Sequence, residues 1–269
     1  MRTVAFGALL LLASCTQPAA TRRSGQWIWT AADATVLERA RAARPEFVAG
    51  VWVASITYDT LAKAPTLRLA LPPRTAGRDS VAVVVRFEQS FDAAWRGGDD
   101  ARLSAQLGAR FAALRRMLDA QPVIVQEMQL DYDVPVRLLP RWSAVLRTLV
   151  HGPLADREIW VTSLVAHLRD ARFGRLLRGV VAGHMLQVFD TGEPADPRRM
   201  REVVRLLDRT DLPFRLGVGA FERQLGPGRR TLHRAWFRLI PELQQHRRWR
   251  GVWIFPAGMP WTSLLGAPS

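Results

Sequence analysis

Eight short apolar segments, most of them separated by stretches with helical spacing, constrain the fold of this chain more than any other feature. Each has the length and composition of a β-strand, and several are continuously apolar, as strands covered on both faces are. The eight segments are 26–30, 47–58, 81–87, 123–133, 158–165, 182–189, 214–221 and 251–255. The helical patterns between them are 31–43, 101–118, 140–149, 171–177, 197–207 and 232–245.

Eight strands that alternate with helices over about 245 residues predict a (β/α)8 TIM barrel, formed as a single domain by residues 25–269. An open doubly wound sheet uses the same alternation and is the alternative fold. The first strand is not followed by a glycine-rich dinucleotide fingerprint, which favours the barrel. No clear helix precedes the third strand, and residues 66–71 are expected to form an extra extended segment instead.

The amino terminus has the pattern of a bacterial lipoprotein signal. A positive start at Arg2 precedes an apolar run over 4–12, which ends in Leu12-Ala-Ser-Cys15. This pattern predicts a cleaved signal peptide over 1–14, lipidation of Cys15 with palmitate or a similar acyl chain, and a linker up to residue 24. A buried amino-terminal helix and an ordinary secretory signal are the alternatives, because the run is too short to span a bilayer of about 30 Å.

The expected location is the cell envelope, with the protein held on a membrane by its lipid. Thr16 follows the cysteine in place of the aspartate that retains some lipoproteins at the inner membrane, which favours the periplasmic side of the outer membrane. Cys15 is the only cysteine, so acylation leaves no thiol for a disulfide or a zinc site. The sequence predicts no particular oligomeric state.

The net charge of +14 comes almost entirely from arginine, with Lys63 as the one lysine. Such a balance suits an anionic membrane surface or an acidic polymer, or else solvated helix faces. No nucleic-acid partner is expected, because no basic-aromatic motif of the known binding modules is present. The five histidines lack the spacing of a zinc site, and no phosphate loop is present, so we expect no metal and no cofactor.

Two carboxylates close together on the fourth strand are the main catalytic candidates. Side chains alternate along a strand, so Glu127, Gln129, Asp131 and Asp133 share one face, which is expected to point into the barrel. Asp131 and Asp133 lie nearest the carboxyl end of the strand, where this fold places its active sites. Their repulsion should raise one pKa and leave one protonated and one ionised carboxyl for acid–base catalysis. The alternative is a structural role, with arginine and backbone donors satisfying both.

Other strand ends supply candidates for substrate binding. Arg86 is expected to pair with Asp131 or Asp133 on the adjacent strand. It either fixes their geometry for catalysis or forms only a structural salt bridge. Glu88 is a reserve catalytic carboxylate. Asp190 is placed either in the site or as the cap of the following loop. The remaining candidates are Gln187, Trp29 and Phe255, whose two aromatic faces would suit a sugar ring, and more weakly Tyr58, Ser55 and Ser163. The basic segment 224–230 is either a cover for the site or a plain surface loop.

The stretch Met128-Gln-Leu-Asp-Tyr-Asp-Val-Pro135 resembles the signature of a bacterial family of exported or lipid-anchored proteins, domain of unknown function 3142. The likeness also takes in Trp27-Ile-Trp29, Val83-Val-Val-Arg86 and Leu186-Gln-Val-Phe-Asp190, so it spans most of the mature chain. This resemblance implies a glycosidase-like barrel and brings no established reaction.

The chain is also distantly similar to the chitinase-like family 18 glycoside hydrolases, whose fourth strand ends in Asp-x-Asp-x-Glu and whose sixth often carries Met-x-Tyr-Asp. In this likeness Asp131 and Asp133 match the first two aspartates, and Asp190 matches the aspartate of the second motif. Pro135 stands at the position of the catalytic glutamate, so the chitinase mechanism does not carry over.

These observations predict a lipid-anchored envelope protein with a glycoside-hydrolase-like barrel that binds or hydrolyses a polysaccharide. Whether the chain is an enzyme is left open. The rival is a non-catalytic envelope-binding or assembly lipoprotein, which the missing glutamate favours and the clustered carboxylates disfavour. A scaffold for an anionic polymer or a membrane surface is a third hypothesis and rests on charge alone.

Overall fold

The computed structural model describes residues 20–78, 80–226 and 229–266. The expected signal peptide and Cys15 lie outside the described residues. In the part of the chain that the structure describes, no helix is both long and apolar enough to cross a membrane.

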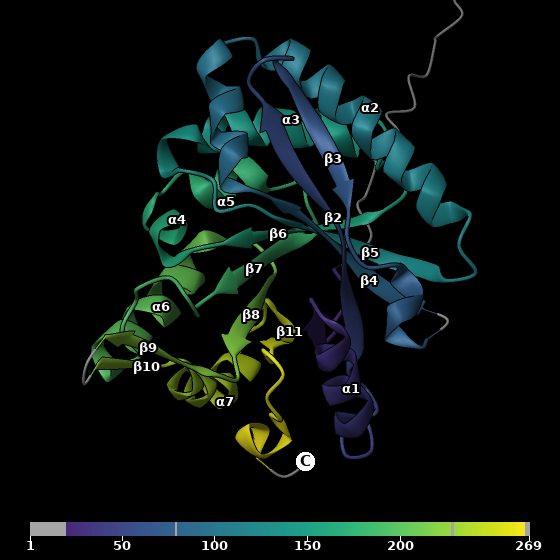
Figure 1. Cartoon of the computed structure of the whole chain (residues 1–269). Helices are drawn as coiled ribbons and strands as arrows, with labels where there is room; N and C mark the ends of the chain where they lie inside the picture. The colour runs from purple at the N-terminus through teal and green to yellow at the C-terminus, as the bar shows by residue number, and fades with distance from the viewer. Residues whose placement is uncertain (1–19, 79, 227–228, 267–269) are drawn as a thin grey trace, which may run out of the picture.

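Eight parallel strands form a closed barrel, which confirms the predicted (β/α)8 fold (Figure 1). The barrel closes because the first strand pairs with both the second and the last. All eight strands lie where the apolar segments predicted them, with ends shifted by a few residues. They are β1 Gly25–Ile28, β2 Val48–Asp59, β4 Ser80–Phe87, β5 Ile124–Asp131, β6 Glu158–Ser163, β7 Gly183–Gln187, β8 Phe214–Gly219 and β11 Trp249–Phe255.

Helices surround the barrel on its outside (Figure 1). The α-helices are α1 Ala31–Ala40, α2 Asp100–Asp119, α3 Leu139–Val150, α4 Val165–Arg169, α5 Phe173–Leu177, α6 Pro197–Thr210 and α7 Ile240–Gln244. Short 3-10 turns are η1 Pro73–Ala76, η2 Gln89–Gly97, η3 Val136–Leu138, η4 His233–Leu239 and η5 Thr262–Leu265.

The predicted helices form where the sequence supplies both an apolar stripe and a cap. In α2, the side chains at a spacing of three or four residues are buried, as the pattern predicted, and Asp99 caps the helix by accepting from the Arg102 backbone N–H at 2.8 Å. The α6 helix begins with Pro197 after the capping residue Asp196, as expected from their order.

Two connections differ from the simple strand–helix repeat, the one between β2 and β4 and the one between β8 and β11. The extra extended segment is β3 (Ala64–Leu69), an antiparallel partner of β2 that takes the place of a helix. The predicted helix over 232–245 is mostly the 3-10 turn η4 followed by the short α7. The basic segment 224–230 is part of a hairpin formed by β9 (Glu222–Gly226) and β10 (Arg229–Leu232), not a plain surface loop.

Aromatic side chains fill the middle of the barrel. Trp27 and Trp253 are buried there with centroids 5.9 Å apart, next to a small cluster that includes Val84 and Met185. Glycine makes room for these rings: a Cβ atom on Gly50 would lie 2.4 Å from the Trp253 ring. The rings separate the two ends of the barrel, and each end contains a different set of polar side chains.

An ion network around Glu127 occupies the amino-terminal end of the barrel. The fully buried Arg215 donates to both Glu127 carboxylate oxygens, at 2.6 and 3.0 Å, and Arg23 reaches Oε2 at 2.7 Å. The Arg215 guanidinium carbon also lies 3.6 Å from the centroid of the Trp160 ring. Each buried charge therefore has a partner of opposite sign.

The segment 20–24 is fixed to this same end of the barrel. The hydroxyl and the backbone N–H of Thr21 donate to Glu158 at 3.1 and 3.2 Å, and the Arg250 side chain donates to the Ala20 carbonyl at 2.9 Å. The chain therefore enters the barrel at the amino-terminal ends of the strands, opposite the end where this fold places its active sites.

Candidate functional site

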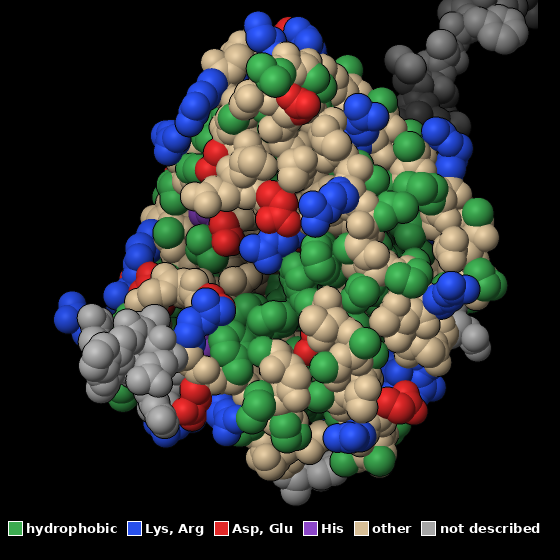
Figure 2. Space-filling model, viewed as in Figure 1, with side chains coloured by type: hydrophobic (Ala, Val, Ile, Leu, Met, Phe, Trp, Pro, Cys, Tyr) green, Lys and Arg blue, Asp and Glu red, His purple; other side chains and the backbone are tan. Residues whose placement is uncertain are grey.

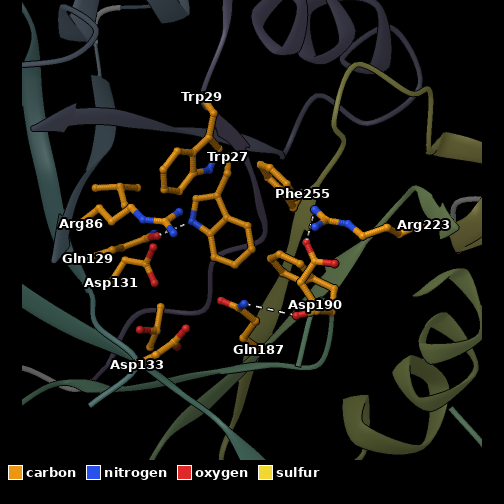
Figure 3. Close-up of a pocket in the computed structure, with 13 residues that line it drawn as sticks. Trp27, Trp29, Arg86, Gln129, Asp131, Asp133, Gln187, Asp190, Arg223 and Phe255 are labelled. Atoms are coloured by element: carbon orange, nitrogen blue, oxygen red, sulfur yellow. Dashed lines mark hydrogen bonds and ion pairs between the residues drawn. The ribbon is translucent and has the colours of Figure 1, made fainter. Parts of the chain in front are cut away.

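A pocket of about 370 Å³ opens at the carboxyl ends of the barrel strands. Figure 2 shows this face of the molecule, where acidic and basic side chains lie beside hydrophobic ones around the hollow at its middle. The pocket is lined by Trp27, Trp29, Val84, Arg86, Gln129, Asp131, Asp133, Thr162, Gln187, Phe189, Asp190, Arg223 and Phe255 (Figure 3).

The two predicted carboxylates, Asp131 and Asp133, lie together in this pocket. Asp131 is the last residue of β5 and half-buried, while Asp133 follows in the next segment and is exposed. Burial, and then the charge of Asp133, raise the pKa of Asp131 to about 6, although Arg86 and the Thr162 hydroxyl oppose the rise. The alternation along the strand thus brings both carboxyls to one pocket, as predicted.

The pKa of Asp133 is also raised, although solvent reaches part of the side chain. Burial by the surrounding protein is the main cause, and the charges of His167 and Arg86 act against it. With both pKa values raised, the pair retains protons at higher pH than ordinary aspartates do. Such a pair is able to hold one protonated and one ionised carboxyl at the same time, which is what general acid catalysis requires.

Arg86 lies on β4 directly opposite Asp131 in the strand register and lines the pocket beside it. Its guanidinium carbon lies 5.2 Å from the centroid of the Trp29 ring, and its Nε lies 3.6 Å from Glu88 Oε2. Glu88 accepts from the Ser55 hydroxyl at 2.8 Å and does not line the pocket. The structure therefore brings Arg86 to the aspartates and leaves Glu88 beside them, outside the pocket.

Four aromatic rings cover one side of the pocket (Figure 3). Phe189 and Phe255 are stacked with centroids 5.3 Å apart, and Trp29 meets Phe255 edge to face at 5.9 Å. The Trp27 indole N–H donates to Gln129 Oε1 at 2.7 Å, which fixes the fourth ring. Flat apolar rings next to carboxylates suit a ligand with both apolar faces and hydroxyl groups, as sugars have.

The β9–β10 hairpin adds a charged side chain, Arg223, to the rim of the pocket. Arg223 on β9 donates to Asp190 Oδ2 at 2.6 Å, and His233 Nε2 lies 3.2 Å from Asp190 Oδ1. Asp190 adopts a left-handed backbone conformation with φ of 54°, which directs the chain into the following loop. Asp190 therefore lines the pocket, which is one of the two roles expected from the sequence, and it also holds the hairpin, which the sequence did not predict.

The structure brings together seven of the predicted site residues: Trp29, Arg86, Asp131, Asp133, Gln187, Asp190 and Phe255. It places Tyr58 elsewhere, on the part of β2 that pairs with Pro65 of β3, because β2 continues beyond the barrel into a hairpin. Ser163, a weaker candidate, is fully buried and contacts His184 Nδ1 at 2.7 Å, so it does not reach the pocket.

Six lining residues were missed by the site prediction: Trp27, Val84, Gln129, Thr162, Phe189 and Arg223. Trp27 and Gln129 lie two positions from predicted residues on the same strand, so alternation alone could have identified them. The position of Arg223 depends on how the hairpin folds back over the barrel, and no local sequence signal specifies that contact.

Pro135 does not line the pocket and instead precedes the turn η3. Asp133 is the last residue of this segment that lines the pocket. The departure at Pro135 from the chitinase-like pattern therefore removes one carboxyl from this segment and leaves both pocket aspartates in place.

Within the described ranges, no group of three or more histidine, cysteine, aspartate or glutamate side chains is placed to hold a metal ion. The polar groups of the pocket are carboxylates, guanidinium groups, amides and one hydroxyl. Its own residues can therefore supply proton transfer and charge stabilisation.

No protein-family model and no curated protein sequence matches the chain, so the likeness to domain of unknown function 3142 stays a prediction. Solved structures do match. A chitinase from Chromobacterium violaceum has a TM-score of 0.65 at 14% identity, over 91% of this chain and 98% of that one. The spore cortex-lytic enzyme SleL of Bacillus megaterium has a TM-score of 0.63 at 12% identity, over 93% of this chain and 75% of that one.

A family 18 chitinase from Crocus vernus is also similar, with a TM-score of 0.57 at 8% identity over 90% of this chain and 95% of that one. At such low identities the likeness is one of fold. The chain therefore has the barrel fold of the chitinase-like family 18 glycoside hydrolases.

Proposed function

We propose that this protein is a lipid-anchored envelope protein whose barrel hydrolyses a glycosidic bond in an envelope or extracellular carbohydrate. The observation that carries the proposal is the pair Asp131 and Asp133, which share one pocket and have raised pKa values. Hydrolysis of a glycoside requires a protonated carboxyl near the scissile oxygen and a negative charge near the sugar carbon.

Asp133 is the proposed acid, and Asp131 is the proposed electrostatic partner. Asp133 is the more exposed of the two and is the one a bound chain reaches first. The pair shares the retained proton, which lies on Asp133 when Asp133 transfers it to the leaving oxygen and the glycosidic bond breaks. Asp131, ionised in that state, stabilises the positive charge that develops on the sugar ring. A water molecule then attacks the sugar carbon and gives its proton to the Asp133 carboxylate, which restores the acid. Arg86, opposite Asp131 in the register, opposes the rise in both pKa values and so favours an ionised carboxyl in the pair.

The aromatic side of the pocket supports a sugar as the ligand. Trp29 and Phe255 present ring faces beside the carboxylates, and the Trp29 ring is held by Trp52 at 4.9 Å between centroids. The structural neighbours with this fold include chitinases and a spore cortex-lytic enzyme. Chitin-type and peptidoglycan-type polymers are therefore the first substrates to test.

The decisive variant is Asp133→Asn, assayed for reducing-end release from chitin oligosaccharides, peptidoglycan and other envelope polysaccharides. We expect kcat/KM to fall by at least about 100-fold with little change in thermal unfolding, because general acid catalysis contributes about 10²–10⁴-fold. Glu242→Gln, which removes an exposed carboxyl on α7, is the matched control and should leave the rate unchanged. Full activity of Asp133→Asn would rule out the assignment.

A non-catalytic binding role is the second candidate, and the Pro135 departure from the chitinase-like pattern favours it. The same panel of polysaccharides distinguishes hydrolysis from binding without cleavage. Binding of a polysaccharide by the wild type without release of reducing ends would support the binding role, and in that case Asp133→Asn should alter affinity alone.

A further inference from the structure

We propose that the end of the barrel opposite the pocket binds the surface of an anionic phospholipid bilayer. The binding surface is a strip of arginines, here called the basal arginines. They are Arg22, Arg178, Arg247, Arg248 and Arg250. The inference rests on the proposed lipid anchor only for the choice of a bilayer as partner, since the charges belong to the barrel itself.

The basal arginines come from separate loops that meet at the amino-terminal ends of the strands. Arg22 precedes β1, Arg178 follows α5, Arg247 and Arg248 precede β11, and Arg250 is its second residue. Contacts link them: the Arg250 side chain donates to the Arg247 carbonyl at 3.0 Å and to the Ala20 carbonyl at 2.9 Å. The strip is therefore continuous and includes the point where the chain enters the barrel.

Carboxylates neutralise this strip only in part. Asp211 is shared by three of the arginines: Arg178 at 2.6 Å, Arg247 at 3.8 Å, and Arg248 in direct contact. Among the described residues, neither Arg22 nor Arg250 lies within 4.0 Å of a carboxylate. Burial, and then the charges of Arg22 and Arg215, lower the pKa of Arg250, as expected where like charges crowd together.

Three of the five basal arginines are also accessible, whereas the Arg248 side chain is only 12% exposed and Arg250 is half-buried. The side chains of Arg247 and Arg178 are 76% and 59% exposed, and Arg22 is exposed as well. Ile124, at the beginning of β5 and so at the same end of the barrel but across it from β11, is 67% exposed. The exposed arginines match the chemistry of a phosphate headgroup layer.

The anchor brings this end close to a bilayer. Ala20 is held by Arg250, so only residues 16–19 separate the fixed chain from Cys15. Even fully extended, that connection reaches about 17 Å. A barrel on so short a connection meets the membrane with its basal end, and charges within about 8 Å of the headgroups escape screening at physiological salt. The pocket then faces away from the membrane, toward soluble or wall polymers.

The test uses residues 16–269 without the acyl chain, because this segment contains every strand and helix of the closed barrel. Sedimentation with vesicles of phosphatidylglycerol and phosphatidylcholine is compared with phosphatidylcholine alone. We expect binding to the anionic vesicles only, and a loss of more than about tenfold in 0.5 M salt. Charge reversal in Arg22→Glu with Arg247→Glu should weaken binding by more than about tenfold.

The matched control reverses two exposed arginines at the pocket end, Arg68→Glu with Arg102→Glu, which changes the net charge by the same amount. This control should bind as the wild type does. Equal weakening in both double variants would mean that net charge alone attracts the chain, and no weakening in the basal variant would place the contact elsewhere. Either result overturns the proposal. Because no sugar is hydrolysed in these measurements, they are independent of the proposed activity.

Discussion

Asp131 shows how one position sets the chemistry of the pocket. It is the last residue of β5, close enough to the aromatic core to lose water, and it lies opposite Arg86. Burial and the charge of Asp133 raise its pKa to about 6, whereas Arg86 limits the rise. A carboxyl that changes charge near this pH can donate or accept a proton between about pH 5 and 7.

The raised pKa of Asp131 predicts a pH-dependent cost in stability. Near pH 4 the folded protein keeps this carboxyl neutral at little cost. Between about pH 4 and 6 the folded state binds more protons than the unfolded state, so the free energy of unfolding falls as the pH rises. Above about pH 6 Asp131 is ionised in both states, and the folded protein bears the full free-energy cost of that buried charge. Asp131→Asn should therefore stabilise the protein by about 1–3 kcal/mol at pH 7.5, and the gain should approach zero near pH 4.

Urea unfolding at the two pH values measures this difference. Glu242→Gln serves as the control, because its carboxyl is exposed and should give the same small effect at both pH values. A destabilised Asp131→Asn variant at pH 7.5 would mean that Arg86 and other donors stabilise the ionised form, and that the carboxyl has a structural role.

At the scale of the element, β5 carries two different sets of polar side chains on one face. Glu127 lies near its amino-terminal end in the buried network with Arg215 and Arg23, whereas Asp131 and Asp133 line the pocket at the other end. Burial alone raises the pKa of Glu127, but the two arginines outweigh it and the pKa is lowered. The same alternation therefore produces a structural charge at one end and a reactive pair at the other.

Removal of Glu127 should destabilise the barrel strongly. Glu127→Met leaves Arg215 buried without its carboxylate, for which we expect a loss of about 3–5 kcal/mol in urea unfolding. Arg215→Met together with Glu127→Met should cost less than the sum of the two single variants, because both fully buried charges are then removed and only the partly exposed Arg23 loses a partner. Additive losses would show that the pair contributes through packing and not through its charge.

At the scale of the whole molecule, the two ends of the barrel differ in the side chains they carry. The chain enters at the amino-terminal ends of the strands, where residues 20–24 are fixed, and the pocket opens at the carboxyl ends. A lipid on Cys15, as proposed, would hold the basal end to the membrane and leave the pocket open to substrate. Of the segment expected to act as a linker, residues 20–24 contact the barrel end.

The anchor itself is tested by Cys15→Ala. The wild type should incorporate labelled palmitate and partition into the detergent phase of a membrane extract, and the variant should do neither, because Cys15 is the only thiol in the chain. Thr16→Ala, a change at the next residue, should behave as the wild type. Acylation of the Cys15→Ala chain, or its retention in the detergent phase, would contradict the lipidation site.

Local sequence patterns were sufficient for most of the architecture. Strand positions followed from apolar segments, since a strand buried on both faces needs a continuous apolar run, and the inward face of β5 followed from strict alternation. Alternation also predicted the carboxyl pair at the end of β5, while the strand order of the barrel placed Arg86 beside Asp131. The sequence was less informative for η4 and α7, which were predicted as one helix. Their apolar patterns are too short to distinguish a 3-10 helix from an α-helix.

The sequence by itself determined the eight-strand barrel, the inward carboxylates of β5 and the aromatic residues at the strand ends, because each of these depends on spacing along one segment. The tertiary structure decided which candidates meet. It excluded Tyr58 and Glu88 from the pocket, brought in Arg223 through the hairpin, and fixed residues 20–24 at the opposite end. These outcomes depend on contacts between segments far apart in the chain, whose geometry no local pattern contains.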